Sequence, residues 1–113
     1  MVNGKNIALT GASSGIGKAI AHELAGAGAN LILIGRDEER LTQVQQTLGG
    51  THQALVADIS TEDGRQSIVE ACQVMESGLD ILVNKVLNTI LYKFLYKFPY
   101  KFPFKYTYKF PYK

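Results

Sequence analysis

The chain has 113 residues, enough for one small domain, and its 12 Lys or Arg and 10 Asp or Glu give a formal net charge of +2. Its single cysteine cannot form a disulfide within the chain, which fits the cytoplasmic location that we expect. No stretch approaches the roughly 18 apolar residues of a membrane-spanning helix, and the first residues lack the apolar run of a secretory signal. Composition therefore excludes a membrane-spanning protein and a disulfide scaffold.

The composition changes abruptly near residue 85. Residues 1–84 contain all 11 Gly and carry a formal charge of −5, whereas residues 85–113 contain all 11 Phe and Tyr and all three Pro, with a charge of +7. The overall charge is therefore an average over two unlike segments, and it indicates no partner by itself. We divide the chain into a body, residues 1–84, and a low-complexity tail, residues 85–113.

Short apolar runs alternate with longer amphipathic segments along the body. This pattern predicts strands at 6–10, 31–34, 53–57 and 80–83 and helices at 15–27, 37–48 and 61–77. Gly26 and Gly28 are expected to end the first helix in the left-handed conformation, Gly49 and Gly50 the second, and Ser60 is expected to cap the third. Alternation of this kind predicts an α/β fold with a parallel sheet and right-handed crossovers.

A glycine-rich stretch, Thr-Gly-Ala-Ser-Ser-Gly-Ile-Gly from Thr10 to Gly17, joins the first predicted strand to the first helix. Gly11 permits a tight turn, Gly15 lets the backbone approach a ligand, and Gly17 lets helix and strand pack closely. The free N–H groups and the dipole of the helix then favour an anion, most plausibly a pyrophosphate. The alternative is a packing turn that binds nothing.

The spacing Gly-x-x-x-Gly-x-Gly after Thr10 resembles the cofactor loop of the short-chain dehydrogenase/reductase family, with a longer first gap than the standard Rossmann fingerprint. The resemblance covers about residues 4–84. It implies a partial Rossmann-like parallel sheet of strand order 3-2-1-4 with flanking helices; the composition of residues 85–113 predicts an extended or disordered tail after it. It also implies hydride transfer between a nicotinamide dinucleotide and a carbonyl or alcohol carbon. Since family members are longer, we expect a truncated NADP-binding half-domain whose small-molecule substrate is bound only by the full-length parent.

The end of the second predicted strand bears on cofactor choice. In the family, an acidic side chain there binds the ribose hydroxyls of NAD, but this chain has Gly35 followed by Arg36. A guanidinium can bind the 2′-phosphate of NADP through a fork of hydrogen bonds, so NADP is predicted over NAD. The alternative is that Arg36 begins a solvated charged face.

Two further matches complete the predicted site. Asp58 and Ile59 resemble the family element that binds adenine, although Asp58 could instead cap a helix beside Ser60. Asn84 fits the first position of an Asn-Asn-Ala-Gly motif that the next residues do not continue. No metal ligand is predicted. The residues predicted to bind the cofactor are Thr10, Gly11, Ser13, Ser14, Gly15, Ile16, Gly17, Arg36, Asp58, Ile59 and Asn84.

No catalytic residue is predicted. The family uses a Ser and a Tyr-x-x-x-Lys pair, but none of the six Tyr in this chain has a Lys four residues later, and the tail has no Ser. We therefore expect the chain to retain at most dinucleotide binding. The alternative function is a non-catalytic binding module that uses the basic aromatic tail.

The tail alternates aromatic residues at every even position from Tyr92 to Tyr112, interrupted by three prolines that favour an edge strand or an irregular extended segment. Our preferred interpretation is a segment without selected function, produced by a frame shift or a repeated nucleotide unit. The alternatives are contact with single-stranded nucleic acid or with an anionic membrane surface. We also expect the fourth strand to be an exposed edge, on which the tail or a second chain could pair, and the domain to be marginally stable.

Overall fold

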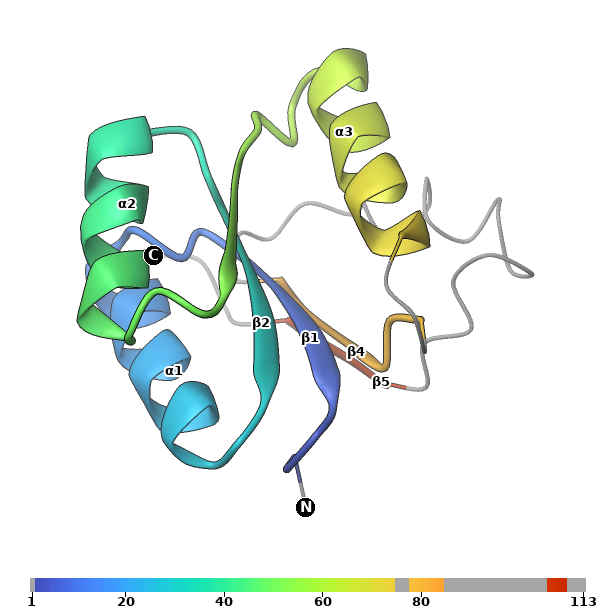
Figure 1. The fold of residues 1–113 in the computed structure, drawn as a ribbon. Coiled ribbons are helices and arrows are strands. Elements are labelled where there is room, and N and C mark those ends of the chain that lie inside the picture. Colours follow the sequence, from blue (N-terminus) through green and yellow to red (C-terminus); the bar gives the residue numbers. More distant parts are fainter. Residues whose placement is uncertain (1, 75–77, 85–105, 110–113) are drawn as a thin grey trace.

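The computed structural model describes residues 2–74, 78–84 and 106–109. Helices and strands alternate along the body, as the sequence predicts, and the predicted boundaries are correct to within a few residues (Figure 1). The first strand is predicted to the residue. The elements in chain order are β1 (Asn6–Thr10), α1 (Gly15–Gly26), β2 (Asn30–Gly35), α2 (Glu38–Thr47), β3 (Gln53–Val56), α3 (Glu62–Gln73), β4 (Ile81–Asn84) and β5 (Tyr106–Lys109).

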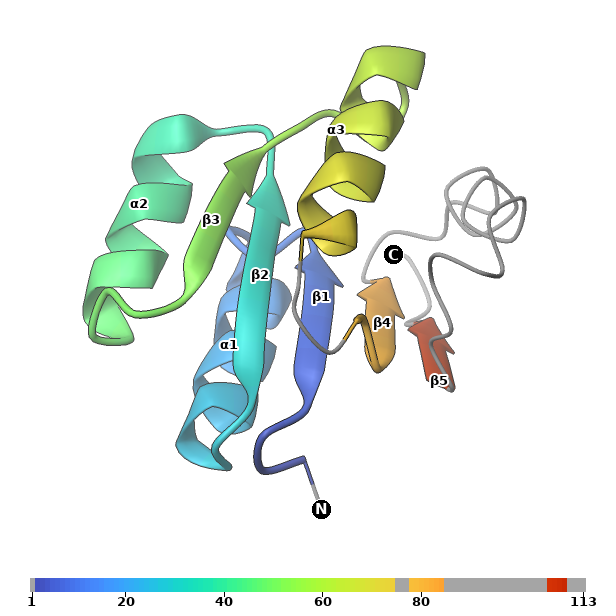
Figure 2. The same cartoon turned by 45° about the vertical axis from the view of Figure 1, so that its right-hand side comes forward.

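The strands form one parallel sheet in the order β3-β2-β1-β4-β5, which confirms the predicted α/β class and the order 3-2-1-4 within the body (Figure 2). Helices α1 and α2 lie on one face of the sheet, and α3 lies on the other (Figures 1 and 2). Because all strands run in the same direction, their carboxyl ends share one edge of the sheet. The turns that leave this edge lead into the three helices.

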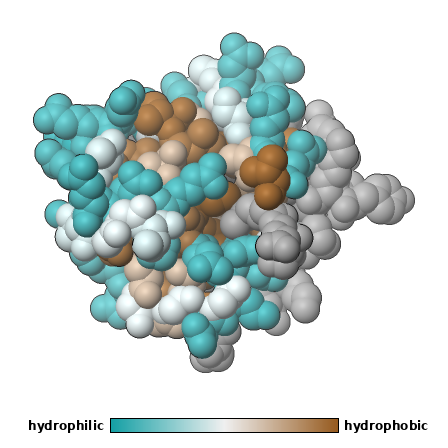
Figure 3. All heavy atoms as spheres, in the orientation of Figure 1, coloured by the Kyte–Doolittle hydropathy of each residue, from teal (hydrophilic) through white to brown (hydrophobic). Residues whose placement is uncertain are grey.

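The core has two halves, one on each face of the sheet. Ala8 of β1 and Leu82 of β4 pack toward α3, whereas Ile7 and Leu9 pack toward α1 and α2. Strands buried on both faces have nearly continuous apolar sequences, which explains why β1 and β2 are apolar runs rather than alternating ones. Strand β3 is less covered: Figure 3 shows apolar surface between α2 and α3, the region where β3 lies, and Val56 at the end of β3 is 47% exposed.

Cys72 is buried on α3 and belongs to the half of the core that faces this helix. Burial raises the pKa of its thiol from 9.0 to about 12, because the apolar surroundings disfavour the thiolate. The thiol is therefore a packing group of the core.

The helix ends follow the predicted chemistry with two corrections. Gly26 is the last helical residue of α1 and does not have the expected positive φ. Gly28, Gly49 and Gly50 all have positive φ, between 77° and 101°, where glycine alone is unstrained. The cap of α3 is Thr61, and the prediction of Ser60 is wrong. Ser60 donates both its N–H and its hydroxyl to the carboxylate of Asp58, at 2.9 and 2.6 Å, so the capping bond falls to the next hydroxyl.

The tail contributes the last strand of the sheet. Strand β5 pairs in parallel with β4, with Tyr106 opposite Ile81 and Lys109 opposite Asn84. The expectation of an exposed edge at β4 is therefore wrong, whereas the expectation that the tail supplies an edge strand is confirmed. Self-association along β4 remains a prediction and would first require β5 to be displaced. The other interpretations of the tail concern residues outside the described part.

The position of β5 has a simple physical reason. A parallel crossover needs about a dozen residues or more, so the next strand cannot begin soon after Asn84. Pro99, Pro103 and Pro111 remove hydrogen-bond donors from the remaining tail. Residues 104–110 form the proline-free stretch that lies far enough along the chain, and β5 falls within it.

Candidate functional site

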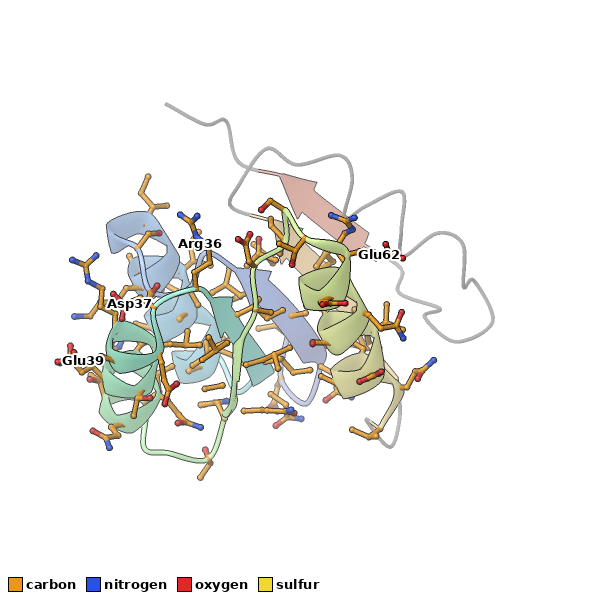
Figure 4. All side chains as sticks on the ribbon, turned by 90° about the horizontal axis from the view of Figure 1, so that it is seen from above. Arg36, Asp37, Glu39 and Glu62 are labelled. Carbon is orange, nitrogen blue, oxygen red and sulfur yellow. The ribbon has the colours of Figure 1, made fainter. Side chains whose placement is uncertain are left out.

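The predicted site residues lie on the turns at the carboxyl edge of the sheet. Figure 4 shows this edge from above, with Arg36 standing between the start of α1 and the loop that follows β3, and Glu62 at the start of α3. Parallel α/β sheets bind ligands in the crevice outside the carboxyl ends of their strands. The three predicted parts of the site, from β1, β2 and β3, therefore meet where such folds place a ligand.

The glycine turn after β1 is held together by its own atoms. Gly11 has a φ of 67°, and the Ser14 hydroxyl donates to its carbonyl oxygen at 2.8 Å. The same hydroxyl accepts from the N–H of Gly17 at 3.2 Å and caps α1. A Cβ on Gly17 would lie 2.7 Å from the carbonyl carbon of Gly11 and nearer still to its oxygen, so no side chain fits there. The Ser14 hydroxyl thus serves the turn itself.

The outer side of this turn is open. A Cβ on Gly15 would meet no atom within 4 Å, and Ile16 is 60% exposed although it is a large apolar residue. Gly15 and Ile16 are therefore exposed at the start of α1, whereas the N–H of Gly17 is bonded to Ser14. Thr10 lies at the end of β1, where its backbone is in register with Asn84 of β4.

The end of β2 accepts only a small residue. A Cβ on Gly35 would lie 3.1 Å from the Ser13 hydroxyl oxygen and 3.4 Å from a methyl carbon of Leu41. Gly35 is buried, and Arg36, the next residue, is exposed. The side chain of Ser13, from the glycine turn, thus lies beside Gly35, the residue before Arg36.

The rest of the charged run after β2 serves α2. Asp37 caps this helix by accepting from the N–H of Arg40 at 3.1 Å, and their side chains form an ion pair at 3.6 Å. Both partners are more than half exposed, so the pair contributes little to stability. Asp37 and Arg40 thus interact with each other at the start of α2.

Asp58 follows β3, where its carboxylate is fixed by Ser60. The side-chain and backbone hydrogen bonds from Ser60 lower the pKa of Asp58; desolvation opposes them, and the positive charge of Arg36 adds the smallest of these effects, again a lowering. Asp58 therefore carries a negative charge at neutral pH, within electrostatic reach of Arg36. Its carboxylate does not cap α3, because Thr61 occupies that role.

Sequence analysis missed one residue of this loop, Gly64 in the first turns of α3. A Cβ on Gly64 would lie 2.6 Å from the carbonyl carbon of Asp58, so helix and loop touch here as closely as Gly17 and Gly11 do. A glycine inside a helical pattern, six residues after Asp58 as Gly17 is six residues after Gly11, is the pattern that could have revealed it.

Neither a metal-binding cluster nor a membrane-spanning helix is found in the part of the chain that the structure describes. In residues 2–74, 78–84 and 106–109, no three His, Cys, Asp or Glu side chains gather in a way that could hold a metal ion. Within the same ranges, no helix has the length and apolarity needed to cross a membrane.

Comparison with known proteins places this geometry in a family. The model of the family described as short chain dehydrogenase matches residues 5–90. Glucose 1-dehydrogenase of Gluconobacter oxydans is 42% identical over 84 residues, which cover 71% of this chain and 32% of the dehydrogenase. The chain thus spans about a third of the length of the curated relatives it matches.

Solved structures show the same relationship. L-sorbose reductase from Gluconobacter frateurii, complexed with NADPH, is 35% identical with a TM-score of 0.68, over 77% of this chain and 35% of the reductase. The 3-ketoacyl-(acyl-carrier-protein) reductase from Brucella melitensis, complexed with NADH, is 35% identical with a TM-score of 0.68, over 74% and 34%. With a family match over most of its length and this fold, the chain belongs to the short-chain dehydrogenase family.

Proposed function

We propose that this chain binds the adenosine diphosphate half of NADP at the carboxyl edge of its sheet. The observation that carries the proposal is the turn from Gly11 to Gly17, in which internal hydrogen bonds fix the backbone while the outer side at Gly15 stays open. Such a helix start binds the diphosphate through N–H groups and the helix dipole. Solved relatives complexed with NADPH and with NADH support a dinucleotide as the ligand.

The preference for NADP over NAD follows from the end of β2. Since Gly35 is buried against Ser13 and Leu41, no carboxylate is available there to bind the ribose hydroxyls or repel a phosphate. Arg36 is exposed at the same edge and can pair with a 2′-phosphate. The chain thus has a donor for the phosphate and no acidic residue at the last position of β2.

The loop after β3 would hold the adenine ring. Asp58 is ionised and can accept from the exocyclic amine, while Ile59, which is partly buried against the core, offers an apolar wall. Thr10, Ser13, Ile16 and Asn84 border the same edge and complete the proposed site. Each is assigned by its place beside the turns and by the family resemblance.

The bound nicotinamide would supply hydride chemistry, which is the family's activity. This chain's own residues bind and orient the adenosine half, and its sequence contains neither a Tyr-x-x-x-Lys pair nor a Ser in the tail. We therefore propose dinucleotide binding without turnover for the 113-residue chain, as a fragment of a longer reductase.

Titration of the chain into NADPH tests the proposal through the fluorescence of the dihydronicotinamide. We expect saturable binding that inorganic pyrophosphate and NADP both displace, with NAD a weaker competitor. Absence of saturation up to about 1 mM protein, equivalent to a binding free energy weaker than about −4 kcal/mol, would contradict the proposal.

A further inference from the structure

The turn before α3 repeats the construction of the turn before α1. In the first turn the Ser14 hydroxyl donates to the Gly11 carbonyl oxygen and accepts from the Gly17 N–H. In the second, the Thr61 hydroxyl donates to the Asp58 carbonyl oxygen at 2.9 Å and accepts from the Gly64 N–H at 3.0 Å. Both sets have the same spacing of three and six residues.

The glycine at the sixth position has the same steric role in both turns. A Cβ on Gly17 would collide with the carbonyl of Gly11, and a Cβ on Gly64 would collide with the carbonyl of Asp58. The two sites are about equally tight, and at Gly64 all three near atoms are backbone atoms of Asp58, the nitrogen at 2.9 Å included. Helix α3 can therefore approach the Asp58 loop only because Gly64 has no side chain.

Helix α3 makes a second contact with this loop. Arg65, the residue after Gly64, is partly buried and donates from Nη1 to the carbonyl oxygen of Ile59 at 3.0 Å. The two loop residues are thus held by consecutive residues of one helix, Asp58 by close packing and Ile59 by a charge-assisted hydrogen bond. Neither contact involves the outer side of the loop, where a ligand would bind.

We infer that Gly64 and Arg65 are positioning residues that set the Asp58–Ile59 loop for the adenine ring. This inference rests on the proposed dinucleotide site. It assigns the diphosphate to one turn and the adenine to a second turn of the same construction, with α1 and α3 on opposite faces of the sheet supporting one turn each. Changes at Gly64 or Arg65 should therefore weaken the adenine end of the site and spare the diphosphate end.

Two partial ligands separate the ends of the site. Adenosine 2′,5′-bisphosphate carries the adenine and the 2′-phosphate without a diphosphate bridge, and inorganic pyrophosphate carries only the anion. We expect Gly64→Ala in the full chain to raise the Kd of the bisphosphate about tenfold and to leave that of pyrophosphate within about twofold. Gly26→Ala is the matched control, because a Cβ on this helical glycine would meet no atom within 4 Å; it should change neither Kd.

A general loss of structure would weaken both ligands together, and so a parallel loss, or no loss, overturns the inference. If Gly64→Ala fails to fold, Arg65→Met takes its place, with Arg40→Met as the control for removal of one positive charge, and the same selective loss is required. Binding of neither ligand by the unmodified chain would reject the proposed function and this inference with it. Binding by the unmodified chain with unchanged variants would reject this inference alone.

Discussion

Arg36 lies close enough to Asp58 to affect its ionisation: after the hydrogen bonds from Ser60, the charge of this guanidinium further lowers the pKa of Asp58. The two residues follow different strands, β2 and β3, and meet at the carboxyl edge of the sheet. An anion and a cation on neighbouring turns of this edge suit a ligand that offers an amine at one point and a phosphate at another. Adenosine 2′-phosphate is such a ligand, because its adenine offers the exocyclic amine and its ribose carries the phosphate.

The first prediction concerns cofactor preference. We expect Arg36→Ala to raise the Kd for NADP at least about tenfold and that for NAD by less than about twofold, because only NADP carries the phosphate that the guanidinium binds. Arg36→Lys should fall between the two, since an ammonium keeps the charge without the fork of donors. Arg40→Ala is the control, because Arg40 pairs with Asp37 on α2. Equal losses for NADP and NAD would contradict the assignment.

The second prediction compares one substitution at two places on α1. Gly17→Ala should lower the free energy of unfolding by about 1–3 kcal/mol, because the added methyl group overlaps the Gly11 carbonyl. Gly26→Ala should leave it unchanged or raise it by up to about 1 kcal/mol, because helical alanine is favoured over glycine and the space is open. Urea denaturation followed by circular dichroism measures both, and effects of the same sign would be inconsistent with the turn.

The third prediction distinguishes the two hydroxyls before α3. Thr61→Ala should cost about 1 kcal/mol of stability through loss of the cap. Ser60→Ala should instead raise the pKa of Asp58 toward its ordinary value, since its hydroxyl bond is the largest cause of the lowering. A carboxylate whose pKa is lower in the folded state than in the unfolded state stabilises the fold at pH values above the unfolded-state pKa. This stabilisation is lost as the pH falls through the folded-state pKa. Acid unfolding should therefore begin at higher pH in Ser60→Ala; an unchanged Asp58 titration by NMR would refute this.

The fourth prediction concerns Cys72. Iodoacetamide reacts with the thiolate, and burial raises the pKa of this thiol to about 12. At pH 8 we expect labelling of the folded chain to be at least about 100-fold slower than in denaturant, and to follow the opening of the core. The raised pKa also predicts stability that is present below pH 9.0 and declines as pH rises toward 12. Mass spectrometry measures the labelling, and rapid labelling under native conditions would place Cys72 at the surface.

The fifth prediction concerns the strand that the tail provides. Deletion of residues 104–113 removes β5 and leaves β4 with unpaired backbone groups, so we expect association that increases with concentration. Deletion of residues 110–113 leaves β5 intact and is the control. Sedimentation velocity distinguishes the two, and identical monomeric behaviour would show that β4 needs no cover.

Local patterns predicted most of the body. The apolar centre of β1 is buried on both faces, and the polar residues Asn6 and Thr10 mark its two ends, so the sequence predicts this strand to the residue. Ser60 was assigned the wrong role because the competition between the Asp58 carboxylate and the helix for one hydroxyl is decided in three dimensions. The role of Gly64 is easily missed in the sequence, since a glycine inside a helix normally indicates only a small loss of stability.

The tail strand was harder to predict for a different reason. Its repeated Tyr-Lys-Phe words are nearly interchangeable, so they encode no preferred register with β4. The length of the crossover and the positions of Pro103 and Pro111 restrict where in the tail a strand can form. A strand forms there only if a sheet edge is available to pair with it. That edge is provided by the body, whose last strand is β4.

Pairing of β4 with β5 joins an acidic body, formally −5, to a basic tail, formally +7, in one sheet. Since backbone pairing here lacks a unique side-chain code, long-range attraction between the two segments becomes a means of keeping the strand in place. That attraction is screened over about 8 Å at physiological ionic strength and over about 3 Å in 1 M salt. The pairing of β5 with β4 should thus depend on salt concentration, whereas the hydrophobic packing around β1 should not.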